Sequence, residues 1–227
     1  MARIYADRAD AGRALAKALA RLRAAPGAIV LGLPRGGVPV AFEVARALEL
    51  PLDVLVVRKL GLPRQPELAM GAIASGGALV VNDEVVRYLG GNAEAFESVR
   101  AREQAELERR ERDYRGSRPP LEVIGRTAIL VDDGLATGAT MEAAVRALRL
   151  LGAGRVIVAV PVASVEARER IAALADEVVC LSTPDFFSAV GQWYADFGQT
   201  GDEEVRDLLA RDRAATQPSR PAEGGEP

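Results

Sequence analysis

Short apolar runs alternate with amphipathic helical stretches along most of the 227-residue chain, and few layered architectures accommodate such an order. Most runs are continuously apolar, which is typical of strands covered on both faces of a parallel sheet. They lie at residues 28–33, 52–57, 78–81, 127–131, 156–162 and 178–181. The helical stretches lie at residues 11–23, 38–48, 140–151 and 165–175. This order predicts an α/β fold, with a doubly wound, mainly parallel sheet that binds ligands at the carboxyl ends of its strands.

Two segments depart from this alternation. Residues 92–115 are rich in Arg and Glu and predict one helix of about 36 Å. Its charges cancel, so we expect it to support a dimer contact or to cover a sheet edge rather than to bind nucleic acid. Residues 214–227 carry Pro, Gly, Ser and Glu and predict a disordered tail. We therefore expect one domain over residues 1–213.

Two residue counts exclude several kinds of chemistry. The chain has no histidine, which excludes Ser-His-Asp triads and His-ligated zinc or iron sites. Its single cysteine, Cys180, cannot form an intrachain disulfide or a thiolate zinc site. Catalysis must therefore use carboxylates, Arg, Lys, hydroxyls, backbone amides or a hard metal ion such as Mg²⁺.

Charge and hydropathy indicate where the protein works. The net charge of −3 gives no reason to expect a nucleic-acid partner. No apolar run reaches the roughly 18–20 residues that span a membrane, so we expect no membrane partner. The chain starts with mixed charge and has no apolar signal-peptide core, which predicts a cytoplasmic protein.

The most informative segment is residues 128–140. A buried strand leads directly into Asp132 and Asp133, a short Gly/Thr loop follows, and a helix begins near Met141. Loop amides and a helix N-terminus suit a phosphate monoester, whereas paired carboxylates suit sugar hydroxyls or a hard cation. The segment therefore predicts a sugar-phosphate site. The alternative is that the two carboxylates only cap a turn.

Residues 131–140 resemble the phosphoribosyl pyrophosphate (PRPP) signature of type I phosphoribosyltransferases. The resemblance implies that Asp132 and Asp133 take part in catalysis by binding the ribose hydroxyls, and that they hold Mg²⁺ directly or indirectly. It also implies a 5′-phosphate loop made of Ala136, Thr137, Gly138, Ala139 and Thr140. Hypoxanthine-guanine enzymes have Asp where this chain has Ala136, so the loop is closer to the adenine type and supplies no base for the nucleophile.

Two further segments resemble parts of the family's site. Arg35, Gly36 and Gly37 follow the first strand and resemble the Arg-Gly core of the pyrophosphate loop, although a plain strand-to-helix turn is the alternative. Arg58 and Lys59 close the second predicted strand, where two cations would offset the charge of a departing diphosphate. Residues 60–68 would then form a mobile lid, with Arg64 as a further pyrophosphate ligand.

Aromatic residues gather near the C-terminus in a chain that has few of them. Residues 183–198 loosely resemble the hood that surrounds the base in purine phosphoribosyltransferases. The resemblance implies a base site formed by Phe187, Val190, Trp193 and Asp196. The alternative is a small hydrophobic core that seals the hood.

These expectations together predict a cytoplasmic, homodimeric, Mg²⁺-dependent enzyme whose small-molecule substrates are PRPP and a nitrogenous base. The base would displace pyrophosphate from C1 of the ribose, and its identity is left open. One alternative is a PRPP-binding regulatory protein without turnover. Another is a phosphohydrolase or transferase that acts on a different sugar phosphate.

Overall fold

A five-stranded parallel sheet forms the centre of the computed structural model, which describes residues 4–62, 65–82, 85 and 93–216. The strand order is β2-β1-β6-β7-β8. These strands are β1 (Ala28–Gly32), β2 (Leu52–Val54), β6 (Thr127–Val131), β7 (Arg155–Val162) and β8 (Glu177–Ser182). The continuous apolar runs place buried side chains on both faces of the sheet, so the expected doubly wound α/β fold is confirmed.

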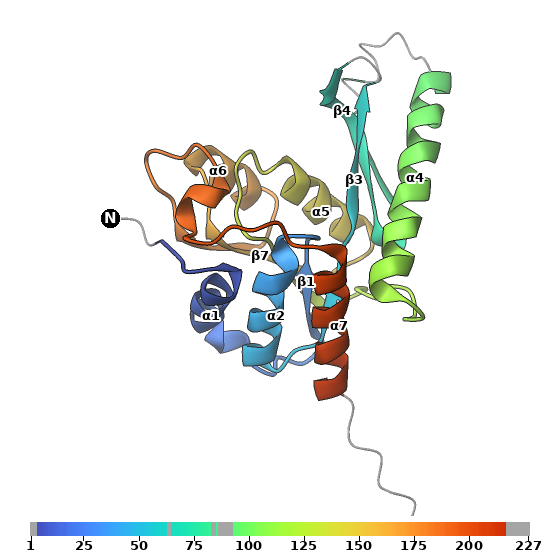
Figure 1. The fold of residues 1–227 in the computed structure, drawn as a ribbon. Coiled ribbons are helices and arrows are strands. Elements are labelled where there is room, and N and C mark those ends of the chain that lie inside the picture. The colour runs from blue at the N-terminus through green and yellow to red at the C-terminus, as the bar shows by residue number, and fades with distance from the viewer. Residues whose placement is uncertain (1–3, 63–64, 83–84, 86–92, 217–227) are drawn as a thin grey trace, which may run out of the picture.

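Helices cover both faces of the central sheet (Figure 1). Val30 and Ile129 point into one core, which is completed by α1 (Arg8–Ala18), α2 (Gly37–Leu48) and α7 (Asp202–Thr216). Leu31 and Leu130 point into the other core, which is completed by α5 (Ala139–Leu150) and α6 (Val165–Ala172). The described residues also form short 3₁₀ helices at η1 (Ala20–Leu22), η2 (Ser75–Gly77) and η3 (Val190–Trp193).

A separate antiparallel sheet projects beside the central one (Figure 1). It consists of β3 (Val57–Leu62), β4 (Gln65–Ala74) and β5 (Ala78–Val81), and α4 (Ala93–Arg115) packs against it. The prediction of one strand over residues 52–57 is therefore wrong, because the chain leaves the central sheet after Val54. Of residues 60–68, expected as a lid loop, residues 60–62 end β3 and residues 65–68 begin its antiparallel partner β4, whereas residues 63–64 lie outside the described residues.

The charged helix α4 covers this second sheet, in agreement with one of the two expectations for it. The i,i+4 ion pairs from Glu106 to Arg110 and from Glu108 to Arg112 are present at 2.8 and 3.9 Å. Arg115, the last residue of α4, turns inward to Asp53 of β2, with 3.0 Å between Arg115 Nη2 and Asp53 Oδ2. A buried carboxylate thereby fixes the end of α4 against the central sheet.

Helix α7 is an element that the sequence patterns did not predict. Its Val205, Leu208 and Leu209 are buried in the core shared with α2. The helix continues through Thr216, so residues 214–216 are helical rather than part of a tail, and residues 217–227 lie outside the described residues. Among the helices that the structure describes, none is long and apolar enough to cross a bilayer. The homodimer stays a prediction.

Candidate functional site

Two carboxylates stand at the carboxyl end of β6, where Asp132 and Asp133 follow the buried Val131. Because β1 lies beside β6, the loop after β1 reaches the same edge, and the Leu33 amide donates to the Val131 carbonyl at 3.0 Å. This loop needs its glycines for close approach. A Cβ atom on Gly36 would overlap the Asp133 carboxylate, and one on Gly37 would lie 2.7 Å from the Val131 oxygen.

Arg8 of α1 completes this carboxylate site, and sequence analysis did not predict it. Its Nε donates to Asp133 Oδ2 at 2.8 Å, and its Nη1 donates to the Gly198 carbonyl at 2.7 Å. The guanidinium also lies over the Phe197 ring, 4.0 Å from its centroid. The ion pair joins residues 125 positions apart, so no local pattern marks Arg8 as a site residue.

The two carboxylates lie in an environment that disfavours their charge. Burial and the neighbouring Asp133 raise the pKa of Asp132 well above its usual value. Burial also raises the pKa of Asp133, and the hydrogen bond from Arg8 opposes that rise. A hydroxyl donor or a cation at this place would relieve the electrostatic cost of two adjacent, partly buried carboxylates.

A cavity of about 480 Å³ opens over this pair, a size that suits a small molecule. Of the predicted site residues, Asp132, Asp133, Arg35 and Gly36 line it together. The peptide bond between Pro34 and Arg35 in this wall is cis. The remaining wall is formed by Arg8, Leu33, Pro34, Phe197, Gly198, Gln199 and Thr200.

The predicted phosphate loop, residues 136–140, connects β6 to α5 and is held from outside by α6. Ser164, which caps α6, donates its hydroxyl to the Ala136 carbonyl at 2.8 Å. Gly138 has φ +74°, and α5 begins at the next residue, Ala139. Gly138 has no side chain to cap the helix, so the first amides of α5 remain suited to an anion.

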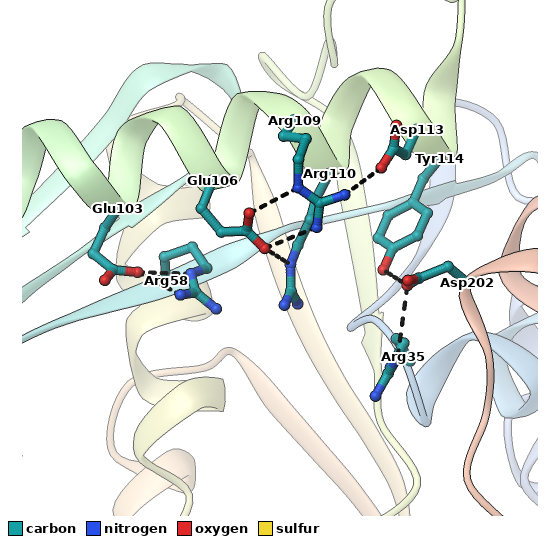
Figure 2. A network of polar contacts seen from close by, with 9 residues as sticks. All are labelled: Arg35, Arg58, Glu103, Glu106, Arg109, Arg110, Asp113, Tyr114 and Asp202. Atoms are coloured by element: carbon teal, nitrogen blue, oxygen red, sulfur yellow. Dashed lines mark hydrogen bonds and ion pairs between the residues drawn. The ribbon is translucent and has the colours of Figure 1, made fainter.

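The predicted catalytic cations line a second cavity, of about 420 Å³. Lys59 and Arg58 of β3 share it with Thr140 at the start of α5, and neither lines the cavity over the acidic pair. Arg58 donates its Nε to Glu103 Oε2 of α4 at 2.9 Å (Figure 2). Arg64, the other predicted cation, lies outside the described residues.

The four predicted base-site residues lie in the hood, beside the first cavity rather than on its wall. Phe187 stacks with Trp193 at 6.4 Å between centroids, and Asp196 Oδ1 accepts from the Gly198 amide at 2.9 Å. Val190 and Trp193 pack against Tyr5 and Tyr194, as the alternative of a small sealing core describes. Their contact with a base stays a prediction.

The pKa of Tyr114 on α4 predicts how the stability of the protein changes at high pH. Burial and the Asp202 carboxylate raise its pKa from 10.0 to about 12. Because the folded-state pKa exceeds the unfolded one, the stability that Tyr114 contributes is complete below pH 10 and is lost as the pH rises through 12. Urea unfolding at pH 9 and 11.5 should show that the free energy of unfolding falls less between these two pH values for Tyr114→Phe than for the wild type. Equal losses would contradict this account.

The oxygen ligands of this site suit a hard cation that also binds oxygens of a substrate. Among the described residues, no three Asp, Glu, His or Cys side chains gather in a way that would hold a metal ion. At the end of β6, Asp132 and Asp133 together supply two carboxylates. This fits Mg²⁺, which proteins commonly bind through one or two carboxylates together with substrate oxygens.

An acidic pair and a small-residue loop follow a central strand of the parallel sheet, which is the arrangement that the resemblance to type I phosphoribosyltransferases implies. The sequence model of the phosphoribosyl transferase domain matches residues 3–197, and the chain belongs to this family. The expected resemblance is therefore confirmed.

Two kinds of relatives agree with this membership. A protein from Mycobacterium tuberculosis H37Rv, named a putative phosphoribosyl transferase, is 53% identical over 209 residues. The match covers 92% of this chain and 47% of the relative, so the chain spans about half the length of the curated relatives it matches. The crystal structure of TT1426 from Thermus thermophilus is 50% identical, with a TM-score of 0.82, and the match covers 92% of this chain and 98% of that one.

Proposed function

We propose that this protein is a Mg²⁺-dependent phosphoribosyltransferase that transfers the phosphoribosyl group of PRPP to a nitrogenous base. One observation carries the proposal. The acidic pair after β6 and the Arg35-Gly36 segment after β1 line one cavity, and the phosphate loop follows directly in the chain. A sugar diphosphate with a 5′-phosphate needs these three kinds of contact.

Each part of PRPP has a matching group in this arrangement. The Asp132 and Asp133 carboxylates would accept hydrogen bonds from the ribose 2′- and 3′-hydroxyls. Loop amides and the hydroxyls of Thr137 and Thr140 would hold the 5′-phosphate. The Arg35 guanidinium, with the amides of Gly36 and Gly37, would bind the diphosphate. Bound Mg²⁺ would neutralise part of the diphosphate charge beside the acidic pair.

The reaction would exchange one bond at C1 of the ribose for another. The C1–O bond to diphosphate breaks, and its electron pair leaves with the diphosphate. A base nitrogen forms the new bond to C1, and the proton that this nitrogen loses passes to the departing diphosphate. The protein would accelerate this step by fixing the ribose and by stabilising the departing charge. Lys59 and Arg58, which the sequence assigns to the departing diphosphate, share a cavity with Thr140 and would instead contact the 5′-phosphate held at the start of α5.

A PRPP-binding protein without turnover is the second candidate function. Arg58 is held by Glu103, and neither Arg58 nor Lys59 lines the cavity of the acidic pair, which supports binding without catalysis. Pyrophosphate release separates the two candidates. The enzyme would release pyrophosphate from PRPP in the presence of one member of a panel of purine and pyrimidine bases, whereas the regulatory protein would release none.

Calorimetric titration of PRPP, with and without Mg²⁺, tests the site itself. We expect micromolar binding that requires Mg²⁺ and that exceeds the affinity for ribose 5-phosphate, because ribose 5-phosphate lacks the diphosphate. A folded wild-type protein that does not bind PRPP would overturn the proposal. Equal affinity for both ligands would instead indicate a site for another sugar phosphate.

A further inference from the structure

Arg35 stands where the predicted diphosphate site meets helix α7. Its side chain is about one-third exposed, and it lines the cavity over the acidic pair. Arg35 Nη1 lies 3.8 Å from Asp202 Oδ1, which is close enough for an ion pair but too long for a hydrogen bond. The guanidinium is therefore oriented by a charge while its N–H donors remain available for a ligand.

Asp202 is itself held in place from the opposite side. Tyr114 of α4 donates its hydroxyl to Asp202 Oδ1, the oxygen that faces Arg35 (Figure 2). The Tyr114 side chain is only 2% exposed and is packed into the core, so its hydroxyl is a fixed donor. This hydrogen bond and the Arg35 guanidinium lower the pKa of Asp202, which keeps the carboxylate ionised.

We propose that Asp202, fixed by Tyr114, is a positioning residue that directs the Arg35 guanidinium toward the diphosphate of the substrate. The inference rests on the proposed function, because it assumes that PRPP occupies the cavity. A long arginine side chain loses rotational freedom when it binds an anion, and a partner that restricts it beforehand reduces this loss. Through Tyr114 and Asp202, helices α4 and α7 would thus influence a site whose wall neither helix forms.

Simple electrostatics makes the opposite prediction. A carboxylate close to an anion site repels the anion, so its removal should strengthen the binding of PRPP. Positioning requires the reverse, since Arg35 would lose its orientation when the carboxylate is removed. The sign of the change in affinity for Asp202→Asn therefore decides between repulsion and positioning.

The experiment measures the affinities of PRPP and ribose 5-phosphate by calorimetry at fixed salt and Mg²⁺. We expect Asp202→Asn to weaken PRPP binding about fivefold, the upper range for an exposed ion pair. Tyr114→Phe should weaken it about twofold, and Asp202→Glu should restore most of the affinity. Ribose 5-phosphate lacks the diphosphate, so its affinity should not change in any variant.

Asp113→Asn is the matched control, because it removes a carboxylate from α4 whose partner among the described residues is the exposed Arg109 side chain. It should leave both affinities unchanged. Unchanged or stronger PRPP binding by Asp202→Asn, or an equal loss for both ligands, would overturn the positioning role alone. A wild-type protein that fails to bind PRPP would instead refute the proposed function on which this role rests.

Discussion

Asparagine at both Asp132 and Asp133 should weaken PRPP binding by roughly 10²- to 10⁴-fold, since a hydrogen bond to a charged group contributes about 1.5–3 kcal/mol. The substitutions keep the shape of both side chains but remove the charge that would hold the ribose hydroxyls and a cation. Calorimetry of the double variant, with wild type measured under the same Mg²⁺ and salt, gives the comparison. A loss below tenfold would contradict the role of the acidic pair.

The stability of the single variant Asp132→Asn distinguishes loss of the site from loss of the fold. Burial and Asp133 raise the pKa of Asp132, so its ionised form favours unfolding at neutral pH. Stability is thereby lost as the pH rises above the ordinary pKa of an aspartate. The variant should therefore bind PRPP more weakly while its urea midpoint rises. A fall in both quantities would show that Asp132 is needed for folding.

Replacement of Asp53 by Asn should destabilise the protein by about 3–5 kcal/mol, the usual cost of leaving buried charges without their partner. Asp53 is 7% exposed and pairs with Arg115 at 3.0 Å and with Arg118 at 3.3 Å. Asn cannot compensate two guanidinium charges. Burial already lowers the pKa of Arg118, which shows that its environment disfavours the charge. Urea denaturation of the variant measures the effect.

Asp113→Asn is again a suitable control, because the Arg109–Asp113 pair is exposed and should contribute less than about 1 kcal/mol. The contrast between the two variants measures the effect of burial on an arginine–aspartate pair within one protein. If Asp53→Asn cost no more than Asp113→Asn, the link from α4 to the central sheet would not depend on charge.

The central layer could be predicted because continuous apolar runs alternate with amphipathic stretches, a local pattern that indicates a parallel sheet with helical crossovers. The second sheet could not, and the strand expected over residues 78–81 lies in this antiparallel sheet as β5 rather than in the central one. Its β3 mixes Arg58 and Lys59 with apolar residues, and its partner β4 contains small residues such as Ala72 and Gly71 that give no clear period. Helix α7 was also missed, since its few apolar residues, such as Val205 and Leu209, are buried by distant elements that include α2, α4 and β2.

The site residues also fall into those that the sequence could predict and those that it could not. Its acidic pair and phosphate loop occupy adjacent positions, so their spacing alone indicates a sugar phosphate. The role of Arg8 in the site comes from its contact with Asp133, 125 positions away in the chain. The role of Asp202 comes from a contact between α7 and the loop after β1. The placement of Arg58 was also beyond sequence reasoning, because its partner Glu103 lies on a helix whose packing no pattern specifies.

The burial of α7 affects where this domain can be cut. The family match ends at residue 197, just before the helix. Helix α7 nevertheless contributes Val205, Leu208 and Leu209 to the core. The Asp212 carboxylate of α7 also accepts a hydrogen bond from the Leu52 amide of β2. A fragment that ended at residue 197 would keep the acidic pair and the phosphate loop but would expose an apolar surface on α2. During synthesis, the same surface would stay uncovered until the ribosome had released residue 216. The folded unit therefore includes α7, beyond the end of the family match.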